Sequence, residues 1–252
     1  MILYQYRGNI NNEVGVDYFI DLITKGSMRF SKPSQFNDPF DCCPARLSEI
    51  PTGALPHAIV DNVSHHMQKV TGKVVGVSCL TPHLRKMLMW SHYGDQHRSV
   101  CVGFDTETLL EKCPTNSEGN PAYKEIREVT YTKVRPNTSD TDVIYKKSEE
   151  WAYEDEYRIV SFAAQGHPQW GSGVWNIPME SIKEVVFGAR VPIELQEHLV
   201  SILMRYRPDI SRKKAVLHSK KFEIVIEYLN KQPKVLPMSG YLLGENGNWI
   251  KT

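Results

Sequence analysis

Two glutamates separated by one residue are the strongest candidates for catalysis in this 252-residue chain. Glu154 and Glu156 end an acid-rich segment that begins at Glu149, and a strand-like run from Tyr157 to Phe162 follows directly. Side chains two residues apart on an extended backbone point to the same side, so the two carboxylates are predicted to converge on one ligand. Paired carboxylates can stabilise a cationic transition state and prepare a nucleophile beside it. The alternative is a solvated strand edge on which a glutamate pairs with Arg158.

A loop with three polar side chains is the second candidate. In the run from Phe36 to Asp41, Pro39 restricts the backbone and a phenylalanine stands at each end of the Asn37-Asp38-Pro39 triplet. The sequence predicts a preorganised ligand-binding loop here. The alternative is that Asn37 and Asp38 only cap turns while the two aromatic rings anchor the loop.

The segment Met89–His97 concentrates side chains with chemical potential near the end of a predicted helix. Trp90 is expected in the core. His92, with Asp95 and His97, is a candidate set of metal ligands, although a histidine held by a backbone hydrogen bond is the simpler explanation. Ser91 lacks the glycine-flanked turn that hydrolytic serines use, which disfavours it as a nucleophile.

The end of the first predicted strand carries aromatic and basic side chains. Tyr4, Tyr6 and Arg7 are expected either to pack along that strand or to bind a ligand. An arginine there can hold a phosphate, and a tyrosine can stack on a planar ring.

Composition limits the classes of protein to consider. Charged residues make up 23% and hydrophobic residues 41% of the chain, as in an ordinary globular protein, and the net charge is only +1. This balance gives no overall argument for nucleic acid as a partner, although a local basic face stays open. The five cysteines form no Cys-x-x-Cys pair, and neither common glycine-rich phosphate loop is present. The sequence shows no long apolar run and no signal peptide, so a cytoplasmic protein without a membrane partner is expected.

Helices and short strands alternate irregularly, which favours an α+β fold. The hydrophobic pattern predicts helices over the ranges 16–23, 60–70, 84–93, 146–153 and 193–206. It predicts strands over 2–6, 28–31, 74–79, 100–104, 126–131, 157–162, 174–177, 183–187 and 222–226. Residues 51–56 have the composition of a linker, and 231–252 lack periodicity. We therefore expect one α+β domain over 1–230, with a mixed, mostly antiparallel split sheet flanked by helices, and a C-terminal tail over 231–252.

Four motifs together resemble a bacterial family of uncharacterised domains. They are Tyr4–Arg7, Phe36–Asp41, Met89–Tyr93 and Lys147–Arg158, and they occur in the order of the family pattern. The layout of that family is similar to the ADP-ribosyltransferase superfamily, which includes bacterial toxins that modify DNA. The resemblance implies an ADP-ribosyltransferase-like fold and NAD as the substrate. It also implies an enzyme that transfers ADP-ribose to a macromolecular acceptor, as a toxin or antiviral defence effector would.

The resemblance also implies roles for individual residues. Glu156 takes the place of the catalytic glutamate, with Glu154 as its partner. Arg7 or Tyr6 takes the first-strand position, and Ser31 or Tyr93 takes the middle position. The remaining predicted NAD-binding residues are Tyr4, Asn37, Asp38, Trp90 and His92. In this scheme a tyrosine or Trp90 stacks on nicotinamide and Arg7 holds the pyrophosphate.

Two other functions stay open from the sequence. One is a non-catalytic module on the same scaffold that binds a nucleotide or a protein, for which the C-terminal tail is also a candidate contact. The other is a metal-dependent hydrolase or nuclease that uses Asp38, Asp41, His92 and Asp95. The leading prediction needs no metal.

Overall fold

The computed structural model describes residues 1–8, 10, 12–43, 74–116, 118–137, 140, 142–162, 171–229, 241–243 and 249–251. The predicted linker at 51–56 and the predicted helix at 60–70 lie outside these residues. Within the described ranges, no helix combines the length and apolar character that a membrane span requires.

The chain forms two compact units, each assembled from separate segments. The first contains Met1–Gln5, Lys25–His83 and Phe104–Ser181, and the second contains Tyr6–Thr24, Leu84–Gly103 and Ile182–Thr252. The predicted division into one domain over 1–230 and a tail stays a prediction. Within 231–252, the described strands β13 (Tyr241–Leu243) and β14 (Trp249–Lys251) pair with each other.

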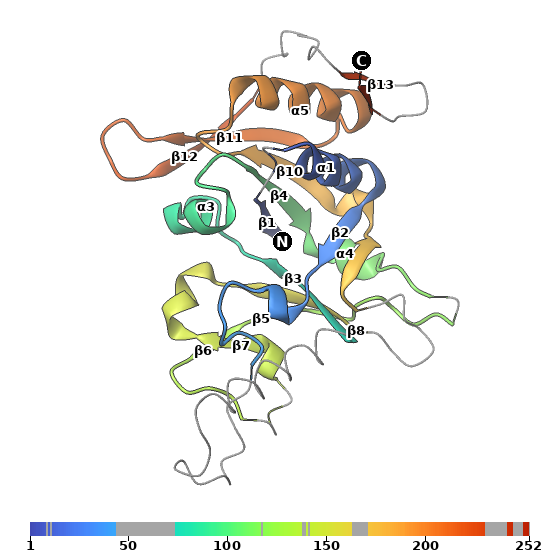
Figure 1. Cartoon of the computed structure of the whole chain (residues 1–252), viewed down its shortest axis with the longest axis vertical. Coiled ribbons are helices and arrows are strands. Elements are labelled where there is room, and N and C mark those ends of the chain that lie inside the picture. The colour runs from blue at the N-terminus through green and yellow to red at the C-terminus, as the bar shows by residue number, and fades with distance from the viewer. Residues whose placement is uncertain are drawn as a thin grey trace. The chain divides into compact units, whose positions relative to one another are not determined.

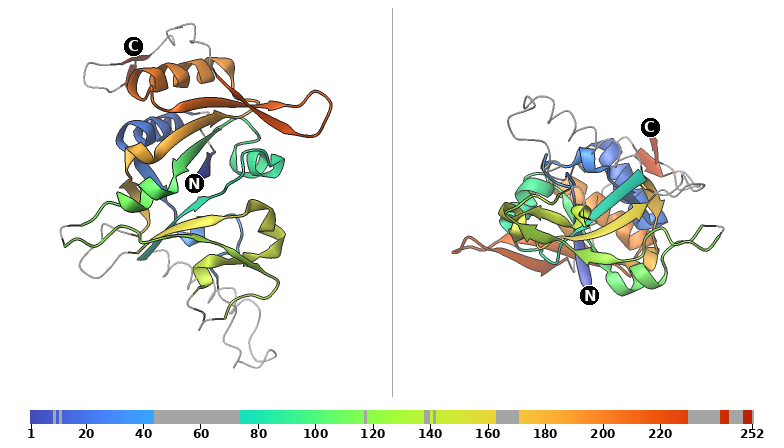
Figure 2. Two further views of the ribbon diagram at one scale, coloured as in Figure 1. Left: turned by 180° about the vertical axis from the view of Figure 1, so that it is seen from behind. Right: turned by 90° about the horizontal axis from the view of Figure 1, so that it is seen from below.

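The first unit is built from short, mostly antiparallel strand pairs (Figures 1 and 2). β8 (Tyr157–Phe162) lies between β3 (Val75–Leu80) and β5 (Ile126–Glu128), antiparallel to both. β2 (Ser27–Phe30) pairs antiparallel with β9 (Gly173–Asn176). β6 (Thr130–Thr132) pairs parallel with β7 (Lys146–Ser148).

Short helices connect these strands. They are α4 (Thr106–Glu111) and four 3₁₀ turns: η1 (Pro33–Gln35), η2 (Val143–Tyr145), η3 (Glu149–Glu154) and η4 (Met179–Ser181). The chain passes from β7 directly through η3 into β8, so this segment carries the Glu-x-Glu pair from one strand to another.

A five-stranded sheet carries the second unit, in the order β1-β4-β10-β11-β12. These strands are β1 (Ile2–Arg7), β4 (Val100–Asp105), β10 (Ile182–Phe187), β11 (Ser211–Leu217) and β12 (Ile224–Tyr228), and β1 and β4 have residues in both units. β10 and β11 are parallel, and the helix α5 (Ile193–Tyr206) connects them, as parallel neighbours require. The other helices are α1 (Glu13–Lys25) and α3 (Met87–Tyr93).

The two longest helices each bury apolar side chains three and four residues apart. α1 buries Phe19, Leu22 and Ile23, and α5 buries Leu199, Ile202 and Leu203. Gly26 follows α1 with a positive φ of 74°, and a Cβ there would lie 2.3 Å from the carbonyl oxygen of Ile177. This glycine therefore ends α1.

Two predicted elements differ from the structure, and one strand was missed. The predicted helix at 146–153 is instead the strand β7 followed by the 3₁₀ turn η3. The single strand predicted over 126–131 is two strands, β5 and β6, that belong to different sheets. Strand β11 is not predicted at all. The structure is a mixture of helices and several small sheets with both parallel and antiparallel pairs, and an ADP-ribosyltransferase-like arrangement stays a prediction.

Candidate functional site

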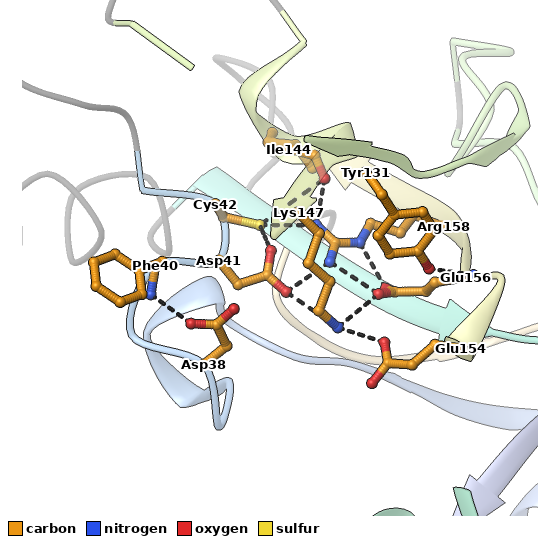
Figure 3. Close-up of polar contacts among 10 residues, drawn as sticks. All are labelled: Asp38, Phe40, Asp41, Cys42, Tyr131, Ile144, Lys147, Glu154, Glu156 and Arg158. Carbon is orange, nitrogen blue, oxygen red and sulfur yellow. Dashed lines mark hydrogen bonds and ion pairs between the residues drawn. The ribbon is translucent and has the colours of Figure 1, made fainter. Parts of the chain in front are cut away.

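Five charged side chains meet inside the first unit, and we call them the charge cluster. The members are Asp41, Lys147, Glu154, Glu156 and Arg158. Figure 3 shows their charged ends pointing toward one another, from the loop after η1, from β7 and from the η3–β8 segment. None is more than 7% exposed, although charged side chains are almost never fully buried unless they are paired.

Lys147 binds three carboxylates. Its Nζ lies 2.5 Å from Oε2 of Glu154, 2.9 Å from Oε2 of Glu156 and 3.6 Å from Oδ2 of Asp41. The same Nζ lies 5.1 Å from the centroid of the Trp151 ring. The β6–β7 register sets this position, because it aligns Lys147 with Tyr131, whose hydroxyl accepts the backbone N–H of Glu156 at 2.7 Å.

Arg158 connects the two motifs that the sequence singled out. It donates from Nε to Oε1 of Glu156 at 2.6 Å and from Nη2 to Oδ2 of Asp41 at 2.7 Å, across 117 residues of chain. Its Nη1 donates to the carbonyl oxygen of Ile144 and to the sulfur of Cys42. This fully buried guanidinium therefore fixes the loop after η1 against β8.

The backbone around the two glutamates is not one extended strand. Glu154 is the last residue of η3, and Asp155 adopts a left-handed conformation with φ 42° and ψ 54°. The carbonyl oxygen of Glu154 accepts a hydrogen bond from Oγ1 of Thr81 at 2.6 Å, which ties the end of η3 to the end of β3. The predicted strand geometry for the pair is wrong, but both carboxylates do converge, on the ammonium of Lys147.

Neighbouring opposite charges determine the ionisation of Glu156 and Arg158. Burial by itself raises the pKa of Glu156, but Arg158 and Lys147 more than reverse this and lower it to about 2. The pKa of Arg158 is raised well above its ordinary value, because the nearby Glu156 and Asp41 outweigh its desolvation. Both groups are therefore charged at neutral pH. With three carboxylates and two cations, the charge cluster has one surplus negative charge when all five side chains are ionised.

Asp38 adds a fourth buried carboxylate close to the cluster in sequence and in Figure 3. Its side chain is only 5% exposed, and Oδ1 accepts the backbone N–H of Phe40 at 2.8 Å. Its Oδ2 is buried without a hydrogen-bond partner among the described residues. The loop thus caps its own turn, as the alternative explanation expects, and also retains an unsatisfied acceptor, as a ligand-binding loop would.

Cys42 is a buried neutral thiol beside the charge cluster. Burial raises its pKa well above the ordinary value, and this outweighs the opposing effect of Arg158. The sulfur therefore acts as a packing and weak hydrogen-bonding group. Among the other cysteines, Cys101 is fully buried and Cys79 is partly buried.

Two more of the predicted binding residues in the first unit serve its strand pairing. Tyr4 forms an isolated antiparallel bridge with Thr81, and Ser31 forms one with Val77. Asn37 is exposed in the loop that ends at Asp41.

The other predicted binding residues lie in the second unit. Trp90 is fully buried, and its Nε1 donates to the carbonyl oxygen of Leu84 at 2.8 Å. The ring of Tyr6 packs edge-on against it at 4.9 Å between centroids. This confirms Trp90 as a core residue and gives no support to its stacking on nicotinamide. Arg7 is partly exposed at the end of β1.

His92 and Tyr93 end α3. His92 is exposed and its ring is tilted against that of Tyr93, with 6.2 Å between the centroids. Within the ranges that the structure describes, no group of three or more histidine, cysteine, aspartate and glutamate side chains has an arrangement that could hold a metal ion. The hydrolase that would use Asp38, Asp41, His92 and Asp95 gains no support from this geometry.

Lys147 and Arg158 are the residues whose importance the sequence hid. Both residues bound the Lys147–Arg158 motif, and the one contact predicted for Arg158 is with a glutamate on a solvated edge. The structure confirms this ion pair but buries it. A usable signal was the presence of a lysine and an arginine on either side of the Glu-x-Glu pair.

Comparison with known proteins adds one partial match. A family model described as "Protein of unknown function (DUF2971)" matches residues 89–159. The matched region begins in α3 and includes four of the five cluster residues, all except Asp41. No curated protein matches the chain. No solved structure matches it either.

Proposed function

We propose that the protein is an ADP-ribosyltransferase-like enzyme that cleaves the nicotinamide–ribose bond of NAD and transfers ADP-ribose to a macromolecular acceptor. One observation carries the proposal. The Phe36–Asp41 loop and the Lys147–Arg158 segment meet in a buried cluster of three carboxyl groups and two basic side chains. NAD carries a positive nicotinamide ring, and its cleavage develops positive charge on the ribose, so surplus buried carboxylates favour both the bound substrate and the transition state.

The two glutamates have different roles in this proposal. The carboxylate of Glu156 is fixed in orientation by Lys147 and Arg158, and the hydroxyl of Tyr131 holds the backbone of the same residue by accepting its N–H. We assign Glu156 to the ribose, as the catalytic glutamate, and Glu154, at the end of η3, to the acceptor. Lys147 then sets the position of both carboxylates. Because Glu154 and Glu156 are only 2% and 3% exposed, the proposal requires the loop around Asp38 to move when NAD binds.

The test is a proton NMR time course of NAD with the purified protein, which follows free nicotinamide with and without a cell extract as a source of acceptors. Glu154→Gln and Glu156→Gln should each lower the rate on the order of a hundredfold, as does the loss of one preorganised electrostatic contact. Glu150→Gln is the matched control, because Glu150 is an exposed member of η3. It should release nicotinamide at the rate of the unmodified protein.

The burial of the pair favours a second candidate, a non-catalytic module that binds a nucleotide or a protein while the charge cluster only holds the loop in place. In this case NAD resonances broaden on addition of protein and no nicotinamide appears under either condition. Turnover that persists at the full rate in folded Glu154→Gln and Glu156→Gln would exclude the proposed role of both glutamates.

A further inference from the structure

The hairpin β11–β12 extends beyond the end of α5, as the views in Figures 1 and 2 both show. Five antiparallel pairs join its strands, from Lys213 opposite Tyr228 to Leu217 opposite Ile224. The tip between the strands contains six residues, 218–223. Both strands, the tip and Glu184, which pairs with Lys213, belong to the second unit.

Basic residues are concentrated in this hairpin. Residues 211–228 contain five of the 30 lysines and arginines of the chain and two of its 29 acidic residues. The hairpin therefore has a formal charge of +3, whereas the rest of the chain together has −2. The near-neutral net charge of +1 conceals this separation.

At the tip, two lysines stand next to an aromatic ring that makes almost no contact with the protein. Phe222 is 99% exposed, and Lys220 and Lys221 are exposed beside it. Neither ammonium group has an ion-pair partner among the described residues. The Phe222 ring therefore buries almost no apolar area in the folded chain, and both of its faces are open to a partner.

The backbone of the tip is held in one conformation. Nδ1 of His218 accepts the backbone N–H groups of Lys220 and Lys221 at 3.0 and 3.1 Å. The backbone N–H of His218 donates to the carbonyl oxygen of Glu223 at 2.9 Å. The exposed side chains thus start from a fixed backbone, which lowers the entropy cost of binding a partner.

The charges on β11 continue from the tip along one face of the strand. Arg212 and Lys214 are two residues apart and share a face, about 7 Å from each other, while Lys213 faces the other way and pairs with Glu184 at 2.7 Å. Glu227 lies opposite Lys214 in the register, and the exposed Glu223 beside Phe222 leaves the tip with a formal charge of +1.

We propose that the tip of the β11–β12 hairpin binds single-stranded nucleic acid, with Lys220 and Lys221 on phosphates and the Phe222 ring stacked on an unpaired base. Lysines that neutralise phosphates beside an aromatic ring that stacks on bases are the combination that single strands require. This function goes beyond the proposed NAD chemistry and does not depend on it.

The experiment measures fluorescence anisotropy of labelled 20-nucleotide single strands of DNA and RNA with the full chain and no NAD. Phe222→Ala should weaken binding to single strands about tenfold, and Phe222→Trp should retain it, because stacking needs only an aromatic face. The double variant Lys220→Gln, Lys221→Gln should lower the slope of log K against log salt by about 1.4, since each phosphate contact on a single strand contributes about 0.7.

The matched control is Lys32→Gln with Lys124→Gln, which removes two exposed lysines elsewhere and should leave both the affinity and the salt slope unchanged. Absence of binding to both kinds of strand would overturn the proposal, as would an equal loss in the control. Two other results would assign the tip to a different partner and also overturn it. One is Phe222-dependent sedimentation with anionic lipid vesicles in place of strand binding, and the other is equal competition by poly-glutamate.

Discussion

At the scale of single residues, Arg158 joins separate segments of the chain at the charge cluster. It is fully buried and contacts two carboxylates, a carbonyl oxygen and a thiol. We expect Arg158→Met to destabilise the fold by about 3–5 kcal/mol, because it leaves Glu156 and Asp41 buried without a cation. Equilibrium unfolding in urea, followed by circular dichroism, measures this change.

The control for that substitution is Arg127→Met. Arg127 pairs with Asp142 at 2.8 Å, but both side chains are more than a third exposed, so the loss of stability should be much smaller than for Arg158→Met. Equal effects of the two substitutions would show that burial does not determine the contribution of these ion pairs.

The pKa of Glu156 predicts how stability changes in acid. Its folded-state pKa of about 2 is lower than its ordinary value of 4.5, so the carboxylate stabilises the fold above pH 4.5. That contribution should be lost as the pH falls from about 4.5 to about 2. Free energies of unfolding measured across this range should fall less steeply in Glu156→Gln than in the unmodified protein. Glu150→Gln, at an exposed position, should retain the full pH dependence.

The sequence predicted the members of the site better than their roles. Glu154 and Glu156 stand out because carboxylates two residues apart are visible in one segment. Asp41 and Arg158 meet only after folding, across 117 residues, and no local pattern encodes that contact. The sequence also could not show that Lys147, rather than a ligand, occupies the point where the carboxylates converge.

At the scale of elements, the turn after α3 holds three consecutive residues with positive φ, none of which is glycine. Asp95, Gln96 and His97 have φ of 47°, 54° and 68°. Each such residue costs roughly 1–2 kcal/mol. The turn brings the ring of His97 parallel to that of Trp90 at 6.2 Å, and Nε2 of His97 to 3.4 Å from Oγ of Ser91. The strained backbone of this turn therefore places the His97 ring beside Trp90 and Ser91.

This strain can be measured at Gln96, whose side chain is exposed. Gln96→Gly should be more stable than Gln96→Ala by about 1 kcal/mol, because only glycine adopts positive φ without penalty. The two variants remove the same contacts, so their difference in free energy of unfolding isolates the backbone. An alanine variant as stable as the glycine variant would mean that the turn relaxes to negative φ.

Helices and strands were predicted correctly where the spacing of apolar residues was clear. α5 is predicted from 193 to 206, as observed, because its apolar residues recur at helical spacing. β11 was missed because Arg212, Lys213 and Lys214 hide the alternation of a strand that pairs on both sides. The segment at 146–153 looked helical because it is rich in helix-forming residues, whereas pairing of β7 with β6 and the contacts of the charge cluster override that preference.

At the scale of the whole molecule, acidic and basic side chains are concentrated in different units. The first unit buries a cluster of three carboxyl groups and two basic side chains, and the second exposes a hairpin with a formal charge of +3. Because net charge averages over both, the value of +1 describes neither. The near-neutral balance that argued against nucleic acid in the sequence therefore does not extend to the hairpin.

The division into units also predicts which part of the chain Arg158→Met destabilises most. All five residues of the charge cluster belong to the first unit, and they connect its loop after η1 to β7 and β8. Proteins open in cooperative parts, and a destabilised part exchanges its amide hydrogens faster than the rest. Hydrogen exchange followed by mass spectrometry should therefore show Arg158→Met raising exchange in β3 and β8 by about a hundredfold or more, the factor expected for loss of a buried ion partner. Helix α5 of the second unit is the internal reference and should change much less. An equal rise in α5 would mean that the charge cluster supports the whole chain rather than the unit that contains it.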